Sequence, residues 1–202
     1  MSAFTPAIAS VQPPLQLHQQ EWLAAIEAYA RVWSAEEPIT ALFQTFMTAS
    51  ADAASRERVE GHLTGSAWLV SADGERVLLS HHRKLDRWLQ LGGHADGDAD
   101  LARVALREAE EESGLADLVV ETAIFDLDRH EIPARGDLPA HWHYDVRYVV
   151  WANGGEDFSV SEESHALAWR RIDALAADAA ADASMRRMAR KWIARRLAKA
   201  AG

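Results

Sequence analysis

Segment 92–115 places the strongest constraint on the fold, because it joins a glycine pair, a polar loop and an amphipathic helix. Gly92 and Gly93 follow a short apolar stretch that is typical of a strand. Helical periodicity then runs over residues 100–113, and Gly114 stands where helices commonly end in a left-handed glycine. The segment therefore predicts a strand, a loop and a helix whose two ends are both defined.

The predicted helix carries three glutamates on one face. Glu108, Glu111 and Glu112 stand at positions i, i+3 and i+4, where like charges repel by roughly a few tenths of a kcal/mol per pair. Bound cations would relieve this repulsion, and oxygen ligands favour Mg²⁺ or Mn²⁺ over softer metals. Arg107 lies four residues before Glu111 and could orient it. A solvated acidic face explains the same pattern, so the helix alone leaves both interpretations open.

Strand patterns lie on both sides of this helix. An Asp-Gly turn at residues 72–75 joins the first two strands into a hairpin. The predicted strands cover residues 62–71, 76–81, 88–91, 117–125, 144–151 and 167–172. The other helical patterns cover residues 15–33, 38–48, 173–181 and 184–200, with a weaker one at 52–60. This order of elements predicts an α/β (α+β) fold, a mixed β-sheet flanked by helices.

The sequence pattern changes from helical to strand-like at about residue 61. Residues 1–60 are predicted to form a helical N-terminal extension, and residues 61–202 the main domain, including the C-terminal helix 184–200. After Asp182 the sequence contains basic residues but no acidic one. We expect this last helix to pack on the domain with a basic outer face, rather than to bind RNA or a membrane.

Composition narrows the classes of function. A chain of 202 residues, 49% of them hydrophobic, can bury a core without covalent cross-links. The net charge of −10 argues against nucleic acid as a partner. No apolar run approaches the roughly 18 residues of a membrane-spanning helix, so no membrane role is expected. The absence of cysteine excludes disulfides and thiolate sites and suits the cytoplasm, where we expect the protein to be.

The spacing within residues 93–115 resembles the Nudix box of the Nudix hydrolases. That box reads Gly, five residues, Glu, seven residues, Arg-Glu, an aliphatic residue, any residue, Glu-Glu, any residue, Gly and an aliphatic residue. Six of its seven fixed residues are present, namely Gly93, Arg107, Glu108, Glu111, Glu112 and Gly114. Chance agreement of this kind is on the order of one in a hundred thousand. Ala99 replaces the first glutamate, and Asp98 or Asp100 beside it could take over its role.

The resemblance implies a Nudix-like fold and a divalent-metal-dependent hydrolase. The substrate class would be a nucleoside diphosphate linked to another moiety, and the diphosphate linkage would be cleaved. Glu108, Glu111 and Glu112 would bind Mg²⁺ (or Mn²⁺) and, with Arg107, form the catalytic set. Ala99 supports an alternative, a Nudix-fold ligand-binding or regulatory protein with little turnover. A homodimer stays open as the oligomeric state.

Residues next to the box are candidates for substrate binding. Gly92 and Gly93 would let the backbone approach a phosphate without an intervening Cβ. His94 follows the glycines directly, at the edge of the expected cleft. Arg83 and Lys84 precede the box and could contact a phosphate, although a solvated strand end explains these two charges equally simply.

Segment 141–148 alternates polar and mostly aromatic side chains. Because side chains alternate across a strand, His141, His143, Asp145 and Arg147 share one face, and we expect the aromatic face to be buried. The polar face is either an exposed surface with cross-strand ion pairs or the substrate-binding wall of a cleft.

The histidines of this segment also allow metal ligation. Imidazole suits Mn²⁺, Zn²⁺, Co²⁺ or Ni²⁺ better than Mg²⁺, and His94 and His130 could lie close to His141 and His143. Phosphate binding or proton transfer are the alternatives, because the ordinary pKa of histidine is near 6.5. We expect His143 to face the site.

Overall fold

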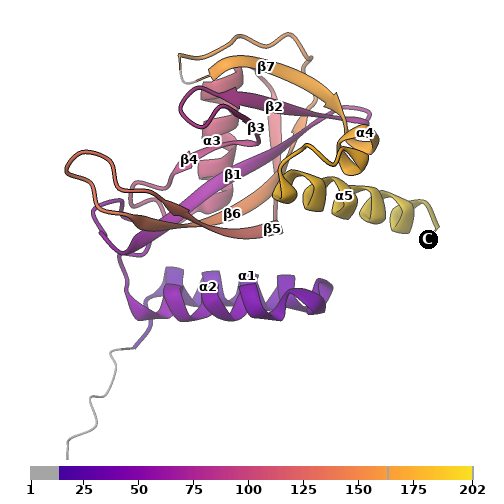
Figure 1. Cartoon of the computed structure of the whole chain (residues 1–202). Helices are drawn as coiled ribbons and strands as arrows, with labels where there is room; N and C mark the ends of the chain where they lie inside the picture. Colours follow the sequence, from indigo (N-terminus) through magenta and orange to yellow (C-terminus); the bar gives the residue numbers. More distant parts are fainter. Residues whose placement is uncertain (1–13, 163, 202) are drawn as a thin grey trace, which may run out of the picture.

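The computed structural model describes residues 14–162 and 164–201 (Figure 1). Its helices are α1 (Leu17–Val32), the 3-10 helix η1 (Ser34–Glu36), α2 (Glu37–Ala49), α3 (Leu101–Ser113), α4 (Ile172–Ala177) and α5 (Ala183–Ala201). Its strands are β1 (Gly61–Ser71), β2 (Arg76–His82), β3 (Arg87–Leu89), β4 (Leu91–His94), β5 (Leu118–Ile132), β6 (His141–Ala152) and β7 (Ser164–Arg171). None of the described helices combines the length and the apolar character that crossing a membrane requires.

The strands form one mixed sheet, as the sequence predicts. The order is β3-β2-β1-β6-β5, with β4 paired to β1 and β7 paired to β2. β1 and β6 run parallel, from the pair Gly61 and Trp142 to the pair Ser71 and Ala152. The other described strand pairs are antiparallel. The parallel pair brings together two segments about 80 residues apart in the chain, which no local sequence pattern announces.

Helices cover both faces of this sheet. Figure 1 shows α1 and α2 side by side beneath the sheet, and α5 at the right of the sheet next to α4. Val146 of β6 belongs to the core cluster that includes α1, α2 and α3. Val149 of the same strand belongs to the cluster that includes Met188 and Trp192 of α5. Because side chains alternate along a strand, these two valines identify the two faces.

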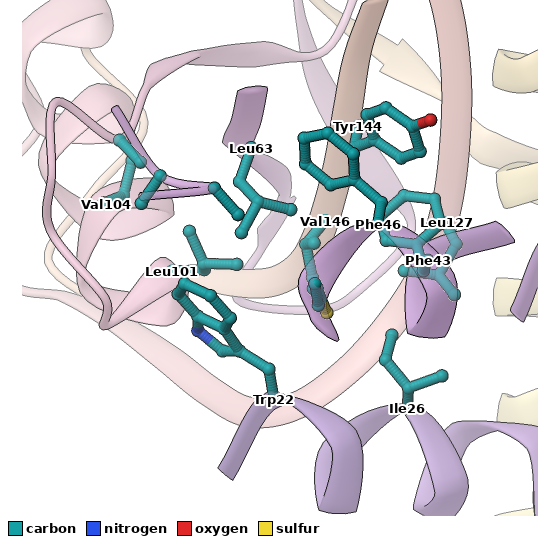
Figure 2. Close-up of a cluster of buried hydrophobic side chains, with 14 of the residues drawn as sticks. Trp22, Ile26, Phe43, Phe46, Leu63, Leu101, Val104, Leu127, Tyr144 and Val146 are labelled. Carbon is teal, nitrogen blue, oxygen red and sulfur yellow. The ribbon is translucent and has the colours of Figure 1, made fainter. Parts of the chain in front are cut away.

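The N-terminal helices share a hydrophobic core with the sheet. Figure 2 shows Trp22 and Ile26 on α1, directed towards side chains that include Leu101 and Val146. Trp22 is 6% exposed and Ile26 is fully buried. Burying a side chain such as Ile26 contributes roughly 1.5–3 kcal/mol. The described part of the N-terminal extension is therefore a packed layer of the domain.

Residues 52–60 do not form the weak helix that their pattern indicates. They form successive turns, in which the N–H groups of Ser55, Arg58 and Gly61 each donate to the carbonyl three residues earlier. Ala53 and Ala54 are buried within these turns. The packing of these two small side chains is therefore compatible with turns, and the prediction of a helix at 52–60 is wrong.

The C-terminal helix forms, but its basic face is not wholly outward. Lys191 is 6% exposed, and its Nζ donates to Asp126 of β5 at 2.7 Å. Arg187, one turn earlier, donates to the same carboxylate at 2.6 Å. Asp126 is fully buried and needs cationic partners, so two residues of the expected outer face turn inward.

Candidate active site

Both ends of α3 are fixed by local hydrogen bonds. At its start, Asp100 accepts a hydrogen bond from the backbone N–H of Arg103 at 3.1 Å. At its end, Gly114 has φ +68°, in the left-handed region, and its N–H donates to the Glu110 carbonyl at 2.8 Å. These caps set which residues of α3 face the sheet.

Two of the α3 glutamates reach the glycine pair of β4. The N–H of Gly92 donates to Oε1 of Glu112 at 2.9 Å. A Cβ at position 93 would stand 2.4 Å from Oε2 of Glu108, which is closer than atoms can approach. A Cβ at position 92 would stand 2.2 Å from Oγ of Ser66. Gly93 is therefore required for Glu108 to lie against this strand, and Gly92 for the close pairing of β4 with β1.

Arg107 connects the glutamate face to the strand. Its Nη2 donates to Oε1 of Glu108 at 2.8 Å and to the carbonyl of His94 at 3.0 Å. Its Nε lies 3.9 Å from Oε1 of Glu111, whose side chain is 65% exposed. The hydrogen bond to Glu108 raises the pKa of Arg107, so this guanidinium is charged at every working pH. Arg107 therefore holds Glu108 in place and partly offsets the repulsion among the three glutamates.

The carboxylate oxygens of these glutamates are suitable ligands for a hard divalent cation. Carboxylate oxygens are the ligands that Mg²⁺ and Mn²⁺ prefer, and Glu111 presents its carboxylate to solvent. Glu112 is oriented by the Gly92 N–H, as metal-ligating carboxylates commonly are. Within residues 14–162 and 164–201, however, the one set of three ligand side chains that is already gathered consists of His62, His94 and His143.

The loop that carries Ala99 is held by its own neighbours. Asp98 accepts from Nη2 of Arg103 at 2.6 Å, and Asp100 caps α3. The indole N–H of Trp22 in α1 donates to the Ala99 carbonyl at 2.8 Å. Both aspartates that could replace the missing glutamate thus have structural partners, and the N-terminal layer contributes directly to the position of this loop.

A hollow of about 830 Å³ lies beside this loop, between α1 and β6. Its lining is acidic, since Glu21, Asp96, Asp98 and Asp100 stand against a single cation, Arg103. A bare diphosphate would be repelled there. We therefore base the candidate active site on the face of α3 and the glycine strand, not on this hollow.

Arg83 and Lys84 lie in the turn between β2 and β3. Arg83 donates through Nη2 to the carbonyl of Ser164 at 3.1 Å, which ties this turn to β7. Lys84 is exposed, and its backbone N–H donates to Nδ1 of His82 at 3.2 Å. Arg83 thus has a structural partner, whereas the Lys84 ammonium faces solvent.

The polar face of β6 differs in exposure along its length. His141 and His143 are half-buried, but Asp145 and Arg147 are only 1% and 2% exposed. The expectation that Asp145 and Arg147 line an exposed surface or an open cleft is therefore corrected. The carboxylate of Asp145 accepts four hydrogen bonds, from Thr64 (2.9 Å), Ser66 (2.7 Å), Gln90 (3.1 Å) and Arg147 (2.7 Å).

His143 lies in a group of histidines, one of which the sequence did not single out. His62 of β1 is 3% exposed and stands 4.8 Å from His143, centroid to centroid. Burial and then the nearby His62 and His94 lower the pKa of His143 to about 2. Burial and then the nearby His94 lower the pKa of His62 to about 4, against the opposing effect of the Arg58 backbone. Both rings are therefore neutral at pH 7.

The fold and the α3 face together define an α/β protein that presents carboxylates beside a glycine strand. The family model of the NUDIX domain matches residues 62–192. The chain belongs to the Nudix family, which confirms the resemblance seen in the sequence.

Solved structures agree on the fold. A MutT protein from Methanosarcina mazei Go1 superposes with a TM-score of 0.54 at 17% identity, over 69% of this chain and 97% of that one. An Ap4A hydrolase binary complex from C. elegans superposes with a TM-score of 0.52 at 20% identity, over 65% and 95%. A comparison with curated proteins gave no match. At these identities the likeness concerns the fold.

Proposed function

We propose that the protein is a divalent-metal-dependent hydrolase that cleaves the diphosphate linkage of a nucleoside diphosphate joined to another moiety. The observation that carries this proposal is the contact of the α3 glutamates with the glycine strand. Gly92 orients Glu112, Gly93 leaves room for Glu108, and Arg107 holds Glu108. Membership of the Nudix family supports the same reaction class.

Glu108, Glu111 and Glu112 would hold Mg²⁺ (or Mn²⁺) on the face of α3. The bound ions would neutralise the diphosphate oxygens and make a water molecule more acidic. Arg107 positions Glu108 through its hydrogen bond, and a glutamate of this set accepts the proton of the attacking water. The N–H groups and small profile of the glycine strand would let the diphosphate lie close to the backbone.

The second candidate is a Nudix-fold binding or regulatory protein with little turnover. Ala99 favours it, because the first glutamate of the box is missing. Asp98 pairs with Arg103 and Asp100 caps α3, which weakens the idea that one of them compensates. The two candidates share the metal-binding glutamates and differ in whether substrate is turned over.

One screen separates them. The full chain is incubated with dinucleoside polyphosphates, nucleotide sugars and nucleoside triphosphates, each with Mg²⁺, with Mn²⁺ or with EDTA, and the products are identified by mass spectrometry. Metal-dependent release of a nucleoside monophosphate or of phosphate from one class supports the hydrolase. Saturable, metal-dependent binding of the same compounds without any product would instead support the binding protein.

A further inference from the structure

The register of the sheet gathers histidines on one face. His62 of β1 is the direct partner of His143 on the parallel strand β6. His94 of β4 pairs with Thr64, two residues after His62, so it points to the same face. His130 of β5 pairs with His143 and lies on this face too. Four strands therefore contribute imidazoles to one patch.

Three of these rings are already close enough to share one ion. One ring nitrogen from each of His62, His94 and His143 lies within 4.8 Å of the others. Around a tetrahedral zinc ion, with Zn–N bonds of about 2.0–2.1 Å, ligand nitrogens stand roughly 3.3–3.4 Å apart. Side-chain rotations that move each nitrogen by on the order of 1 Å would bring the three nitrogens to these distances, with no change in strand register.

The most buried member of the set has ring nitrogens without a well-formed hydrogen bond. Neither ring nitrogen of His62 makes a hydrogen bond within the described residues, although the side chain is 3% exposed. Nε2 of His143 is also buried without a hydrogen bond there. Burying a polar nitrogen without a partner costs roughly 1–3 kcal/mol, so a buried imidazole of this kind indicates a ligand that is bound in use.

We propose that His62, His94 and His143 bind one divalent transition-metal ion of the zinc type, each through one ring nitrogen. This site is separate from the carboxylates of α3, because imidazole selects Zn²⁺, Co²⁺ or Ni²⁺ where carboxylates select Mg²⁺. Three histidines leave the fourth position of a tetrahedral ion open for water or a ligand oxygen. His94 and His143 are half-buried, so an ion could reach the set from solvent.

A direct structural link joins the two sites. Nη2 of Arg107 contacts both the carbonyl of His94 and Oε1 of Glu108, so one side chain sets the position of a histidine ligand and of a catalytic glutamate. An ion on the histidines would stiffen β4 at the residue next to Gly93. The proposal itself does not depend on the hydrolase activity, because it concerns binding of the ion alone.

The test is titration of the metal-free full chain with Co²⁺, followed by its visible absorption, and with Zn²⁺ by calorimetry. One ion per chain with the intense absorption of tetrahedral Co²⁺ is expected, and any further Co²⁺ on the carboxylates of α3 would absorb only weakly. His143→Ala and His94→Ala should each weaken Co²⁺ binding by roughly a hundredfold, since losing even an outer partner of a ligand costs 10–100-fold. His165→Ala, at an exposed histidine outside the patch, is the matched control and should bind as the parent does.

Thermal unfolding checks that the variants are folded and gives a second measurement. Zn²⁺ should raise the melting temperature of the parent and of His165→Ala, but not of His94→Ala. His94→Ala is the suitable variant for this comparison, because His94 lies on a short strand and its replacement keeps the buried His62 and His143 in place. Equal Co²⁺ affinity in all three histidine variants, or no stoichiometric binding by the parent, would overturn the proposal. Glu111→Gln should leave the intense tetrahedral Co²⁺ absorption unchanged, because that absorption reports nitrogen ligands and not the carboxylates of α3, which separates this result from any failure of the hydrolase assignment.

Discussion

Replacing Asp126 by asparagine probes the buried ion-pair network that joins β5 and β6 to α5. Asp126 is fully buried on β5. Its carboxylate accepts from Arg147 at 3.2 Å, from Arg187 at 2.6 Å and from Lys191 at 2.7 Å. The side chains of Arg147 and Lys191 are only 3% and 6% exposed. Asp126→Asn keeps the shape of the side chain and removes its charge.

The size of the effect follows from the charges around this position. Three cations face three buried or half-buried carboxylates, and the set comprises Arg147, Arg187, Lys191, Asp126, Asp128 and Asp145. Asp126 is the one carboxylate that all three cations contact, and breaking a buried ion pair costs about 3–5 kcal/mol. For a chain of this size each kcal/mol lowers the melting temperature by about 2–4 °C, so we expect a fall of about 6–20 °C. Glu36, 22% exposed and still 2.7 Å from Lys191, favours the lower half of that range.

Circular dichroism during heating and urea titration measures this loss. The matched control is Asp173→Asn, because Asp173 pairs with Arg171 at the surface, where both side chains are about 60% exposed. An exposed pair contributes little to stability, so the control should melt within a few degrees of the parent. A free energy of unfolding for Asp126→Asn within about 1 kcal/mol of the parent would refute the view that this network is desolvated and stabilising.

Two further predictions concern the glycine strand and the histidines. In Gly93→Ala the new Cβ would clash with the Glu108 carboxylate and displace it, so kcat/KM should fall by roughly a hundredfold. Unchanged steady-state kinetics would contradict the close approach of Glu108 to the backbone of Gly93. The pKa values of His62 and His143 in the folded chain lie below the ordinary 6.5. Between pH 6.5 and about 4 the metal-free unfolded chain therefore binds protons on these rings that the folded chain does not bind. The free energy of unfolding should fall as the pH falls through this range. Urea denaturation should give a lower free energy of unfolding at pH 5 than at pH 7, and a smaller difference in His143→Asn; equal values for the parent would count against neutral buried rings.

The sequence predicted well those parts of the fold that local patterns encode. The Asp-Gly turn, the periodicity of α3 and the position of Gly114 each depend on neighbouring residues, and all three appear in the structure. Burial of Tyr144 and Tyr148 also follows from alternation along a single strand. The short strand expected at 88–91 is in fact two, because the chain changes partner from β2 to β1 at residue 90.

Features that depend on long-range pairing were not predictable in the same way. His62 reads as one polar residue in a hydrophobic strand, and its role is visible only because β1 lies parallel to β6. Arg187 and Lys191 read as part of a solvated basic face, since their buried partner Asp126 lies about 60 residues earlier in the chain. The buried position of Asp145 likewise depends on donors from β1 and on Gln90.

The central claim, that the α3 glutamates hold the cations for diphosphate cleavage, is tested most directly by comparing Glu111→Gln with Glu110→Gln. Both residues are exposed on the same helix, so neither change should disturb the core, and only Glu111 belongs to the set beside Arg107. With Mg²⁺ and the substrate found by the screen, Glu111→Gln should lower kcat by about a hundredfold or more, and Glu110→Gln should stay within about twofold of the parent. Equal turnover by the two variants, both folded, would contradict the account.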